Sequence, residues 1–467
     1  MTVFDLVVLG GGTGNIVASA AADAGLDVAI VERGRLGGTC LNRGCNPSKK
    51  LIHRADVVET VRNASAYGID ATLDDVPFAD VVAEVNATVA EEAESKAERA
   101  REHDGVTFYQ AAGRFVDERT VEVRTGGEWG DDSNETITGD DVVLAGGSRP
   151  LIPDSIDGAD EASFLTSDEA LRLDELPDRL VVVGGGYIAV EMGHFFGQMG
   201  ATVVIVGHGD VLADREDHDV AERLTEAYRR KHELHLGHEV TALADDDGET
   251  VVTAESEDGD ELEVRGDEVL VATGRRPNSD LWNVEAAGLE TNEKGFVATD
   301  ECLETSVDGV WAIGDIADNF MFKHSGDKEA EYVVENVVRD ARTPVEFPGM
   351  AHAVFGSPQI GSLGKTESDL GDRAYDVGEF EYDETALGSA LASDAGYAKA
   401  LVAPDDEVLG FHVVGPHASM LVHEVSTAVA AGGDAERIAE TIHVHPALSE
   451  VVQGAFRDAR DVAPSGF

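Results

Sequence analysis

The chain has few cysteines and no long apolar run, and each shortage excludes a class of protein. Its 467 residues include three cysteines, too few for a scaffold held together by disulfides. It lacks the long apolar run that a membrane-spanning helix needs. The N-terminal segment MTVFDLVVLGGG has no basic region before its short apolar stretch, so it does not have the pattern of a targeting signal. We therefore expect a soluble, cytoplasmic protein.

Basic residues are also scarce. Lys and Arg total 35 against 92 Asp and Glu, which gives a formal net charge of -57. The acids are spread along the whole chain, so the pattern indicates an acidic surface rather than a disordered acidic tail. Carboxylates repel one another across ~8 Å at physiological salt but only ~3 Å at molar salt. We infer the cytoplasm of a salt-accumulating halophile, and the same charge argues against binding to nucleic acid.

Residues 6–32 are predicted to form a strand, a glycine turn, a helix and a second strand. The segments read LVVLG, GGTGN, IVASAAADAG and DVAIVE, the order of a dinucleotide-binding unit. Gly10 and Gly12 allow a pyrophosphate to approach the helix N-terminus, and Glu32 can accept hydrogen bonds from a ribose. Asn15 replaces the third glycine of the usual fingerprint, so this motif alone is a moderate signal.

A second unit of the same kind begins at residue 180 with LVVVGGGYIAVEMG. Gly184, Gly186 and Ala189 fit the fingerprint fully, so the chain has two nucleotide sites. The second strand of this unit ends in Gly207 and lacks the acid that would bind an NAD ribose and repel a 2′-phosphate. This absence favours NADPH, for which only His208 and Arg215 are available as phosphate ligands.

Two similar phrases bracket the second unit and predict the domain organisation. VVLAGGSRP (142–150) and VLVATGRRPN (269–278) each end a strand and turn away at a proline, so we expect a first domain interrupted by a second. From about residue 345 the pattern changes to that of a separate α+β domain. The predicted α/β protein therefore has three domains: 1–147 with 275–344, 148–274, and 345–467.

The stretch GGTCLNRGCNPSKK places Cys40 and Cys45 close together. Zinc would need two further ligands at suitable spacing, which neither Cys302 nor a histidine pair supplies, and no metal site is predicted. Residues 46–48 form a helix-starting run, and the N-terminal end of a helix lowers the pKa of a thiol. The pattern therefore indicates a reducible disulfide beside the group that the first unit binds.

The same stretch resembles the redox-disulfide signature of the flavoprotein disulfide reductases, a family that includes glutathione, mycothione, trypanothione and mercuric reductases and lipoamide dehydrogenase. AIGDIA (312–317) resembles the second flavin motif of that family, and HVHPALSE (443–450) resembles its catalytic segment. The resemblance covers essentially the full length. It implies two Rossmann-like domains that bind FAD and NAD(P), a C-terminal α+β dimerisation domain, and a homodimer in which each site combines residues of both subunits.

The resemblance also implies residue roles. Cys45 would face the flavin and Cys40 would attack the substrate, while His445 moves the proton and Glu450 orients its imidazole. Lys49 and Glu191 would form an ion pair near the flavin and nicotinamide rings, with Tyr187 as the nicotinamide gate. The residues expected to bind FAD are Gly10, Gly12, Gly14, Asn15, Glu32, Gly38, Thr39, Lys49, Gly113 and Asp315; those expected to bind NADP are Gly184, Gly186, Tyr187, Ala189, His208, Arg215 and Gly274.

Differences from individual family members narrow the range of candidate substrates. The missing acid argues against lipoamide dehydrogenase, and the C-terminus VAPSGF lacks the cysteines of mercuric reductase and high-molecular-weight thioredoxin reductase. Ala20 and Ala21 stand where glutathione reductases carry basic residues. A salt-accumulating cell suggests γ-glutamylcysteine as the thiol, so the predicted reaction is NADPH-dependent reduction of bis-γ-glutamylcystine.

Several alternatives stay open: a dihydrolipoamide dehydrogenase, a mycothione or glutathione reductase-like enzyme, and a flavin-binding redox sensor, although a sensor would not need the proton shuttle. Arg43 and Asn46 stand where the family usually has aliphatic residues. For Arg43 the preferred interpretation is a solvated or structurally paired side chain, with a substrate carboxylate as the alternative.

Overall fold

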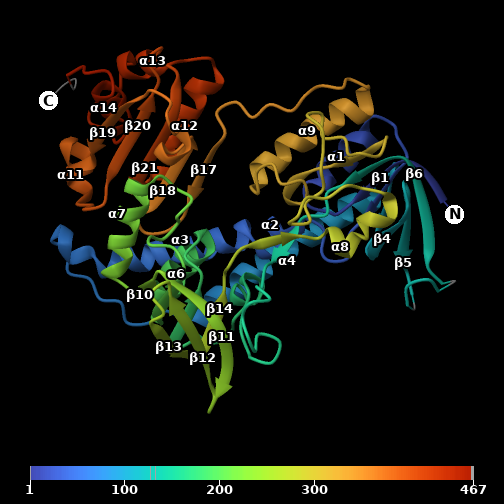
Figure 1. Cartoon of the computed structure of the whole chain (residues 1–467), viewed down its shortest axis with the longest axis horizontal. Helices are drawn as coiled ribbons and strands as arrows, with labels where there is room; N and C mark the ends of the chain where they lie inside the picture. The colour runs from blue at the N-terminus through green and yellow to red at the C-terminus, as the bar shows by residue number, and fades with distance from the viewer. Residues whose placement is uncertain (1, 127, 132, 464–467) are drawn as a thin grey trace. The chain divides into compact units, whose positions relative to one another are not determined.

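The structure is a computed structural model that describes residues 2–126, 128–131 and 133–463. The chain forms two compact units, each assembled from three segments. Unit 1 comprises residues 1–50, 82–151 and 274–347, and unit 2 comprises residues 51–81, 152–273 and 348–467. Helices α3 (Cys45–Arg62) and α4 (Phe78–Glu102) have residues in both units (Figure 1).

Unit 1 is built on a seven-stranded sheet with the order β3-β2-β1-β6-β5-β4, and β16 pairs with β6. Its parallel strands are β1 (Thr2–Leu9), β2 (Val28–Val31), β3 (Val106–Tyr109), β6 (Glu135–Leu144) and β16 (Val310–Ala312). The antiparallel strands β4 (Ala112–Asp117) and β5 (Thr120–Arg124) extend the sheet at one edge. The parallel strands are rich in Val, Ile and Leu because both faces of the sheet are covered.

Helices α1 (Gly14–Asp23) and α9 (Lys323–Arg339) pack together on one face of this sheet. The short elements α8 (Ser279–Trp282) and η2 (Val284–Ala287) close the opposite face, where Trp282 joins the buried core. Helix α9 contacts both α1 and the segment η3 (Gly314–Ile316), so these three elements lie next to one another.

The central part of unit 2 contains a four-stranded parallel sheet with the order β10-β9-β8-β14. The strands are β8 (Arg179–Val183), β9 (Thr202–Gly207), β10 (Glu233–Leu236) and β14 (Glu268–Val271), with helices α6 (Tyr187–Met199) and α7 (His218–Arg229). An antiparallel sheet of β11 (His238–Asp246), β12 (Glu249–Ser256) and β13 (Glu261–Gly266) shares its apolar core.

The C-terminal part of unit 2 is an antiparallel five-stranded sheet covered by helices (Figure 1). Its strands, in order, are β17 (Ala351–Val354), β18 (Gln359–Gly364), β21 (Val408–Gly415), β20 (Tyr397–Val402) and β19 (Asp376–Glu381). The helices are α12 (Ala418–Ala430), α13 (Ala435–Glu440) and α14 (Glu450–Asp458). Shorter elements are η1 (Ala64–Tyr67), α5 (Ser167–Ala170), α10 (Glu367–Leu370), η4 (Tyr382–Glu384) and α11 (Ala386–Leu391).

The chain leaves unit 1 after Leu151 and returns at Gly274. At this point β7 (Ser148–Pro150) and β15 (Arg275–Pro277) pair antiparallel, so the two similar phrases of the sequence lie side by side. The predicted fold, two dinucleotide-binding units followed by an α+β domain, is confirmed. The division between residues 148–274 and 345–467 stays a prediction, because unit 2 contains both segments.

A buried lysine connects the two parts of unit 2. The side chain of Lys399 on β20 is 1% exposed and contacts Asp217 at 2.9 Å, Asp219 at 2.5 Å, and Glu367 on α10. Asp217 is the N-cap of α7, so this cluster ties the second nucleotide unit to the C-terminal sheet. Lys399 and Asp217 are both buried, which is tolerable because each is the other's counter-ion, while Asp219 and Glu367 reach Lys399 from partly exposed positions.

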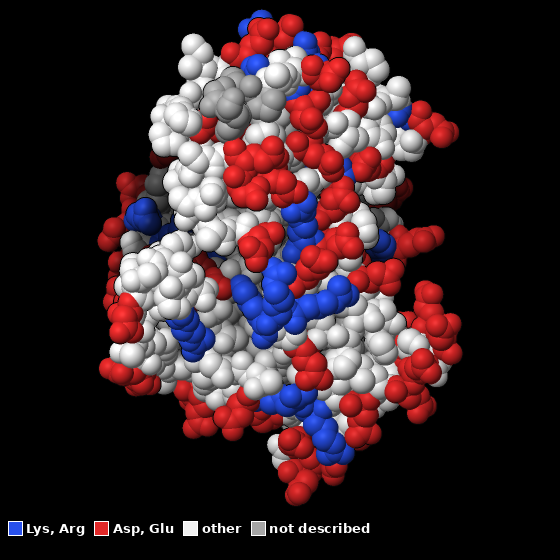
Figure 2. All heavy atoms as spheres, turned by 90° about the vertical axis from the view of Figure 1, so that its left-hand side faces the viewer, with Lys and Arg blue, Asp and Glu red and all other residues white. Residues whose placement is uncertain are grey.

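The surface is acidic, as the composition predicts. Figure 2 shows Asp and Glu across one face of the molecule, with Lys and Arg gathered mainly near its middle. Among the described residues, no helix is long and apolar enough to cross a membrane.

Candidate active site

The first glycine turn joins β1 to α1 and presents bare backbone. Gly10 has φ 102, and a Cβ there would lie 2.2 Å from the carbonyl oxygen of Ala145, so only glycine fits. A Cβ on Gly38 would lie 2.6 Å from the Cα of Gly12, which shows how closely the α2 segment approaches the turn. Gly14 and Thr39 are the neighbouring helical residues. A diphosphate could approach this surface without meeting a side chain.

Glu32 follows β2 and is fixed beside this turn. Its two carboxylate oxygens accept the backbone N–H groups of Gly11 and Gly34, each at 2.8 Å. These bonds leave lone pairs of the same oxygens for a ribose hydroxyl. The geometry fits the predicted adenosine end of FAD.

The second flavin motif of the sequence forms η3. Its Asp315 is held in place by hydrogen bonds from other residues of unit 1. Ser148 donates to Asp315 at 2.5 Å, and Arg275 donates to Ser148 at 2.7 Å. The buried Glu329 of α9 accepts the Gly314 N–H at 2.6 Å, and burial raises the pKa of Glu329 to about 7. Asp315 is thereby anchored with its side chain a quarter exposed, as a ligand for a polar chain requires.

The two cysteines lie at the junction of two helices. Cys40 is in the middle of α2 (Gly38–Arg43), and Cys45 is the first residue of α3. The amide of Asn42 donates to the carbonyl oxygens of Arg35, Leu36 and Gly38 at 3.0–3.3 Å, which holds α2 in place. The sequence therefore brings both sulfurs to one small region of unit 1.

Both cysteines are free thiols in this structure, with Cys40 half-buried and Cys45 exposed. The hydrogen bond between them raises the pKa of Cys40 far above its ordinary value, and burial adds to the effect. The charge of Lys323 on α9 acts in the opposite direction. Cys302 is buried in a separate core cluster, as expected for a structural thiol, and burial raises its pKa.

The second glycine turn joins β8 to α6 and is more open than the first. A Cβ at Gly186 would meet no protein atom within 4 Å, so packing does not explain this glycine but an external group would. Ala189 is buried against the sheet, as the fingerprint predicts. Gly274 has φ 126 at the end of the crossover. This region of unit 2 fits a second dinucleotide.

Tyr187, at the start of α6, is held by a polar network. Its hydroxyl donates to the buried carboxylate of Glu216, which also contacts the imidazole of His352 at 2.8 Å and the hydroxyl of Ser362. Burial and the Glu216 charge raise the pKa of Tyr187, so the phenol stays protonated. Burial alone would raise the pKa of Glu216, but the bonds from its partners lower it.

The predicted phosphate ligands of the second site follow β9 in the chain, with His208 directly after its last residue. Gly207 is buried there, while His208 and Arg215 are exposed. His208 lies 3.8 Å from Asp214, an acid that competes for its charge. His208 and Arg215 stay predicted phosphate ligands, and Asp214 lies close to one of them.

The C-terminal acid/base pair is formed within unit 2. His445 Nδ1 lies 2.9 Å from Glu450 Oε1, and the other Glu450 oxygen accepts the Ala447 N–H at 2.9 Å. Burial opposes ionisation of Glu450, but these bonds outweigh it and lower the pKa of that carboxyl. The His445 side chain is 60% exposed, so its Nε2 is available to a reacting group. His443, by contrast, is 5% exposed and bonded to Glu424, as a structural residue would be.

The remaining predicted residues have mixed environments. Lys49 on α3 donates to Ser48 at 3.4 Å, and Glu191 on α6 accepts the Phe355 N–H at 3.2 Å. The missing side chain of Gly113 is explained by packing, because a Cβ would lie 2.9 Å from Val31. No group of three or more potential metal ligands occurs in the described part of the chain.

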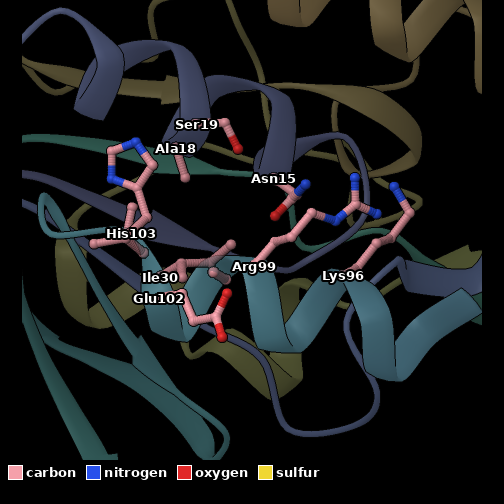
Figure 3. A pocket seen from close by; sticks show the side chains of 10 residues that line it. Asn15, Ala18, Ser19, Ile30, Lys96, Arg99, Glu102 and His103 are labelled. Atoms are coloured by element: carbon pink, nitrogen blue, oxygen red, sulfur yellow. The ribbon is translucent and has the colours of Figure 1, made fainter.

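A cavity of about 410 Å³ lies between α1 and the C-terminal turns of α4. Asn15, predicted to contact FAD, lines this cavity together with Ser19, Lys96 and Arg99. Figure 3 shows the two cations on α4 beside Asn15 of α1. No motif in the sequence predicts this cavity.

Sequence reasoning also missed the residues that support the site. Glu216, Ser148 and Arg275 hold predicted residues through hydrogen bonds between segments far apart in the chain. Lys323, whose charge acts on the Cys40 thiol, is far from the cysteine motif in the chain. A polar residue in a loop carries no sequence signal of the partner that folding brings to it.

Comparison with known proteins identifies relatives over nearly the whole chain. The family model described as pyridine nucleotide-disulphide oxidoreductase matches residues 4–335, and the model for the dimerisation domain of the same family matches residues 350–456. A dihydrolipoyl dehydrogenase of Haloferax volcanii is 37% identical over 97% of this chain and 96% of its own length. A mycothione reductase of Mycobacterium tuberculosis is 35% identical over 98% of this chain and 100% of its own length.

A solved structure shares the fold. The HOCl-induced flavoprotein disulfide reductase RclA of Escherichia coli, as a Cu(II) complex, superposes with a TM-score of 0.85 at 24% identity. The match covers 98% of this chain and 99% of that chain.

Proposed function

The chain belongs to the pyridine nucleotide-disulphide oxidoreductase family, and we propose that it is an NADPH-dependent reductase of a small, carboxylate-bearing disulfide. The observation that carries this proposal is the pairing of Cys40 and Cys45 at the junction of α2 and α3, in the same unit as the first glycine turn. The cofactors of the family are FAD and NAD(P)H.

The two glycine turns fit these cofactors. Gly10, Gly12, Glu32 and Asp315 would hold FAD in unit 1, and Gly184 and Gly186 would hold the nicotinamide nucleotide in unit 2. When bound, FAD accepts an electron pair as hydride from the nicotinamide and makes it available to a disulfide.

The protein residues then carry the exchange to the substrate. In the reduced enzyme, the Cys40 thiolate attacks one sulfur of the substrate, whose S–S bond breaks and releases the first thiol. His445 donates the proton that the leaving thiolate takes up, and Glu450 keeps its Nδ1–H oriented. Cys45 next attacks Cys40, which releases the second thiol and restores the Cys40–Cys45 disulfide.

The choice of NADPH rests on the end of β9. Gly207 offers no carboxylate to a ribose, whereas Glu32 occupies the equivalent position of the first unit. His208 and Arg215 are exposed nearby and would bind the 2′-phosphate. Asp214 offsets part of their charge, so the preference for NADPH should be clear but not absolute.

The substrate class is inferred from the cations around Cys40. Arg43 lies one helical turn from Cys40 on α2, and the charge of Lys323 acts on the Cys40 thiol. Lys323 is paired with Asp327, and Arg43 is the second basic residue of this region in a chain with a net charge of -57. The two basic residues favour a disulfide with carboxylates, and we infer bis-γ-glutamylcystine, in the cytoplasm of a salt-accumulating cell.

Dihydrolipoamide oxidation is the second candidate. It is favoured by the 37% identity to a haloarchaeal dihydrolipoyl dehydrogenase. It is disfavoured by Gly207 and by the two cations, because lipoamide has no carboxylate to pair with them.

A substrate panel at molar KCl tests the proposal. NADPH oxidation is measured with bis-γ-glutamylcystine, glutathione disulfide, mycothione and lipoamide, and NAD reduction is measured with dihydrolipoamide. We expect the highest kcat/KM with bis-γ-glutamylcystine and none in a Cys40→Ser control. Higher kcat/KM for NAD-linked dihydrolipoamide oxidation would overturn the substrate assignment.

A further inference from the structure

Asn46 is the feature that the proposed reaction does not use. It follows Cys45 in the first turn of α3, and its Oδ1 accepts a hydrogen bond from the Cys40 thiol, with 3.6 Å between sulfur and oxygen. The contact is normal for a thiol donor because sulfur is larger than oxygen. Asn46 is half-buried, so water competes only partly for this bond.

The reactivity of the reduced enzyme depends on whether the sulfur of Cys40 or that of Cys45 carries the proton. The thiols of Cys40 and Cys45 are hydrogen-bonded to each other, and a negative charge on one raises the pKa of the other. Once one of the two thiols has lost its proton, the remaining proton is therefore shared by the pair. A group that bonds the thiol form of one sulfur determines where the charge resides.

The surroundings favour a proton on Cys40. The Asn46 oxygen accepts from Cys40, whereas Cys45 begins α3 and has the positive end of the helix dipole beside it. Two charged groups of α9 face Cys40: Lys323 attracts negative charge to this sulfur, and Asp327, paired with Lys323, opposes it. The two α9 charges act in opposite directions, and the Asn46 bond adds to the preference for a proton on Cys40.

We propose that Asn46 is a positioning residue that holds the shared proton on Cys40 and directs the negative charge to Cys45. This inference rests on the proposed function, in which Cys40 attacks and Cys45 faces the flavin. With the proton on Cys40, the attacking sulfur stays a weakly nucleophilic thiol until a base removes that proton.

Two substitutions of similar size test the inference. Asn46→Leu removes the acceptor, and Asn46→Asp keeps an acceptor and adds a charge that disfavours the Cys40 thiolate. Each protein is purified with its cofactor, reduced with dithiothreitol in high salt, and treated with limiting iodoacetamide; the label at Cys40 and Cys45 is then quantified by peptide mass spectrometry across the neutral and mildly alkaline range.

We expect Asn46→Leu to raise the ratio of Cys40 to Cys45 labelling by about two- to tenfold, the range for loss of one hydrogen bond. Asn46→Asp should lower the ratio. Unchanged ratios, or a shift of both variants in the same direction, would overturn the inference, since a general disturbance of α3 would move both alike. Reduction by dithiothreitol keeps this result separate from the proposed function, which is tested by NADPH oxidation with the substrate panel.

Discussion

At the scale of single residues, the two nucleotide units differ most at the ends of their second strands. Glu32 is fixed by the Gly11 and Gly34 N–H groups, whereas Gly207 has nothing to offer a ribose. One carboxylate therefore distinguishes a site for an unphosphorylated ribose from one that tolerates a 2′-phosphate.

Gly207→Glu should shift the coenzyme preference toward NADH. The new carboxylate would accept ribose hydroxyls and repel the 2′-phosphate, so the ratio of kcat/KM for NADPH to that for NADH should fall by about tenfold or more. A Cβ at 207 would lie 3.3 Å from the Gly185 nitrogen, a tight contact, so thermal stability is measured alongside. Gly207→Ala introduces the same Cβ without the charge and serves as the control. An unchanged ratio in Gly207→Glu, with the fold intact, would contradict the assignment.

The four groups that we propose to react could be recognised as candidates from local sequence. Cys40, Cys45, His445 and Glu450 stand in short contiguous phrases, and the structure places the cysteines together and forms the His445–Glu450 bond at 2.9 Å. The supporting residues could not be predicted, because Glu216 meets His352 across 136 positions of the chain. Such partnerships depend on tertiary packing.

At the scale of elements, the buried ion cluster of Lys399 joins α7, α10 and β20. Lys399 and Asp217 are each 1% exposed, and neither can recover water if its partner is removed. This cluster could not be predicted from the sequence, because acids and lysines normally lie on solvated faces.

Lys399→Met should destabilise the protein by about 3–5 kcal/mol, because it leaves the Asp217 carboxylate buried without a counter-ion. Chemical unfolding in high salt measures the change. Arg265→Met is the matched control: Arg265 also contacts several acids but is 42% exposed, so its loss should cost about 1 kcal/mol or less. Equal losses for the two variants would show that the cluster adds no special stability.

At the scale of the whole molecule, the surface charge sets the conditions for folding. With a net charge of -57, the native state should lose activity and unfold as KCl is removed, because screening of the carboxylates weakens. Circular dichroism and activity are followed during dialysis, with restoration of salt as the test of reversibility. Full activity in dilute buffer would contradict the halophile inference.

The dimer can be tested by complementation. The chain contains the dimerisation domain of its family, and we propose that Cys40 of one subunit works with His445 of the other. Heterodimers of a Cys40→Ser chain and a His445→Ala chain should then regain about half of native activity, since one of their two sites is intact. Sites built within one chain would leave both broken, and no activity would return.

The proposed function depends above all on the Cys40–Cys45 disulfide being a second electron acceptor besides the flavin. Anaerobic titration of the oxidised holoenzyme with dithionite measures this directly. The native protein should take up two electron pairs per flavin, with long-wavelength absorbance from the Cys45 thiolate after the first pair, while Cys45→Ser should take up one pair and show no such band. Uptake of a single pair by the native protein would contradict the account.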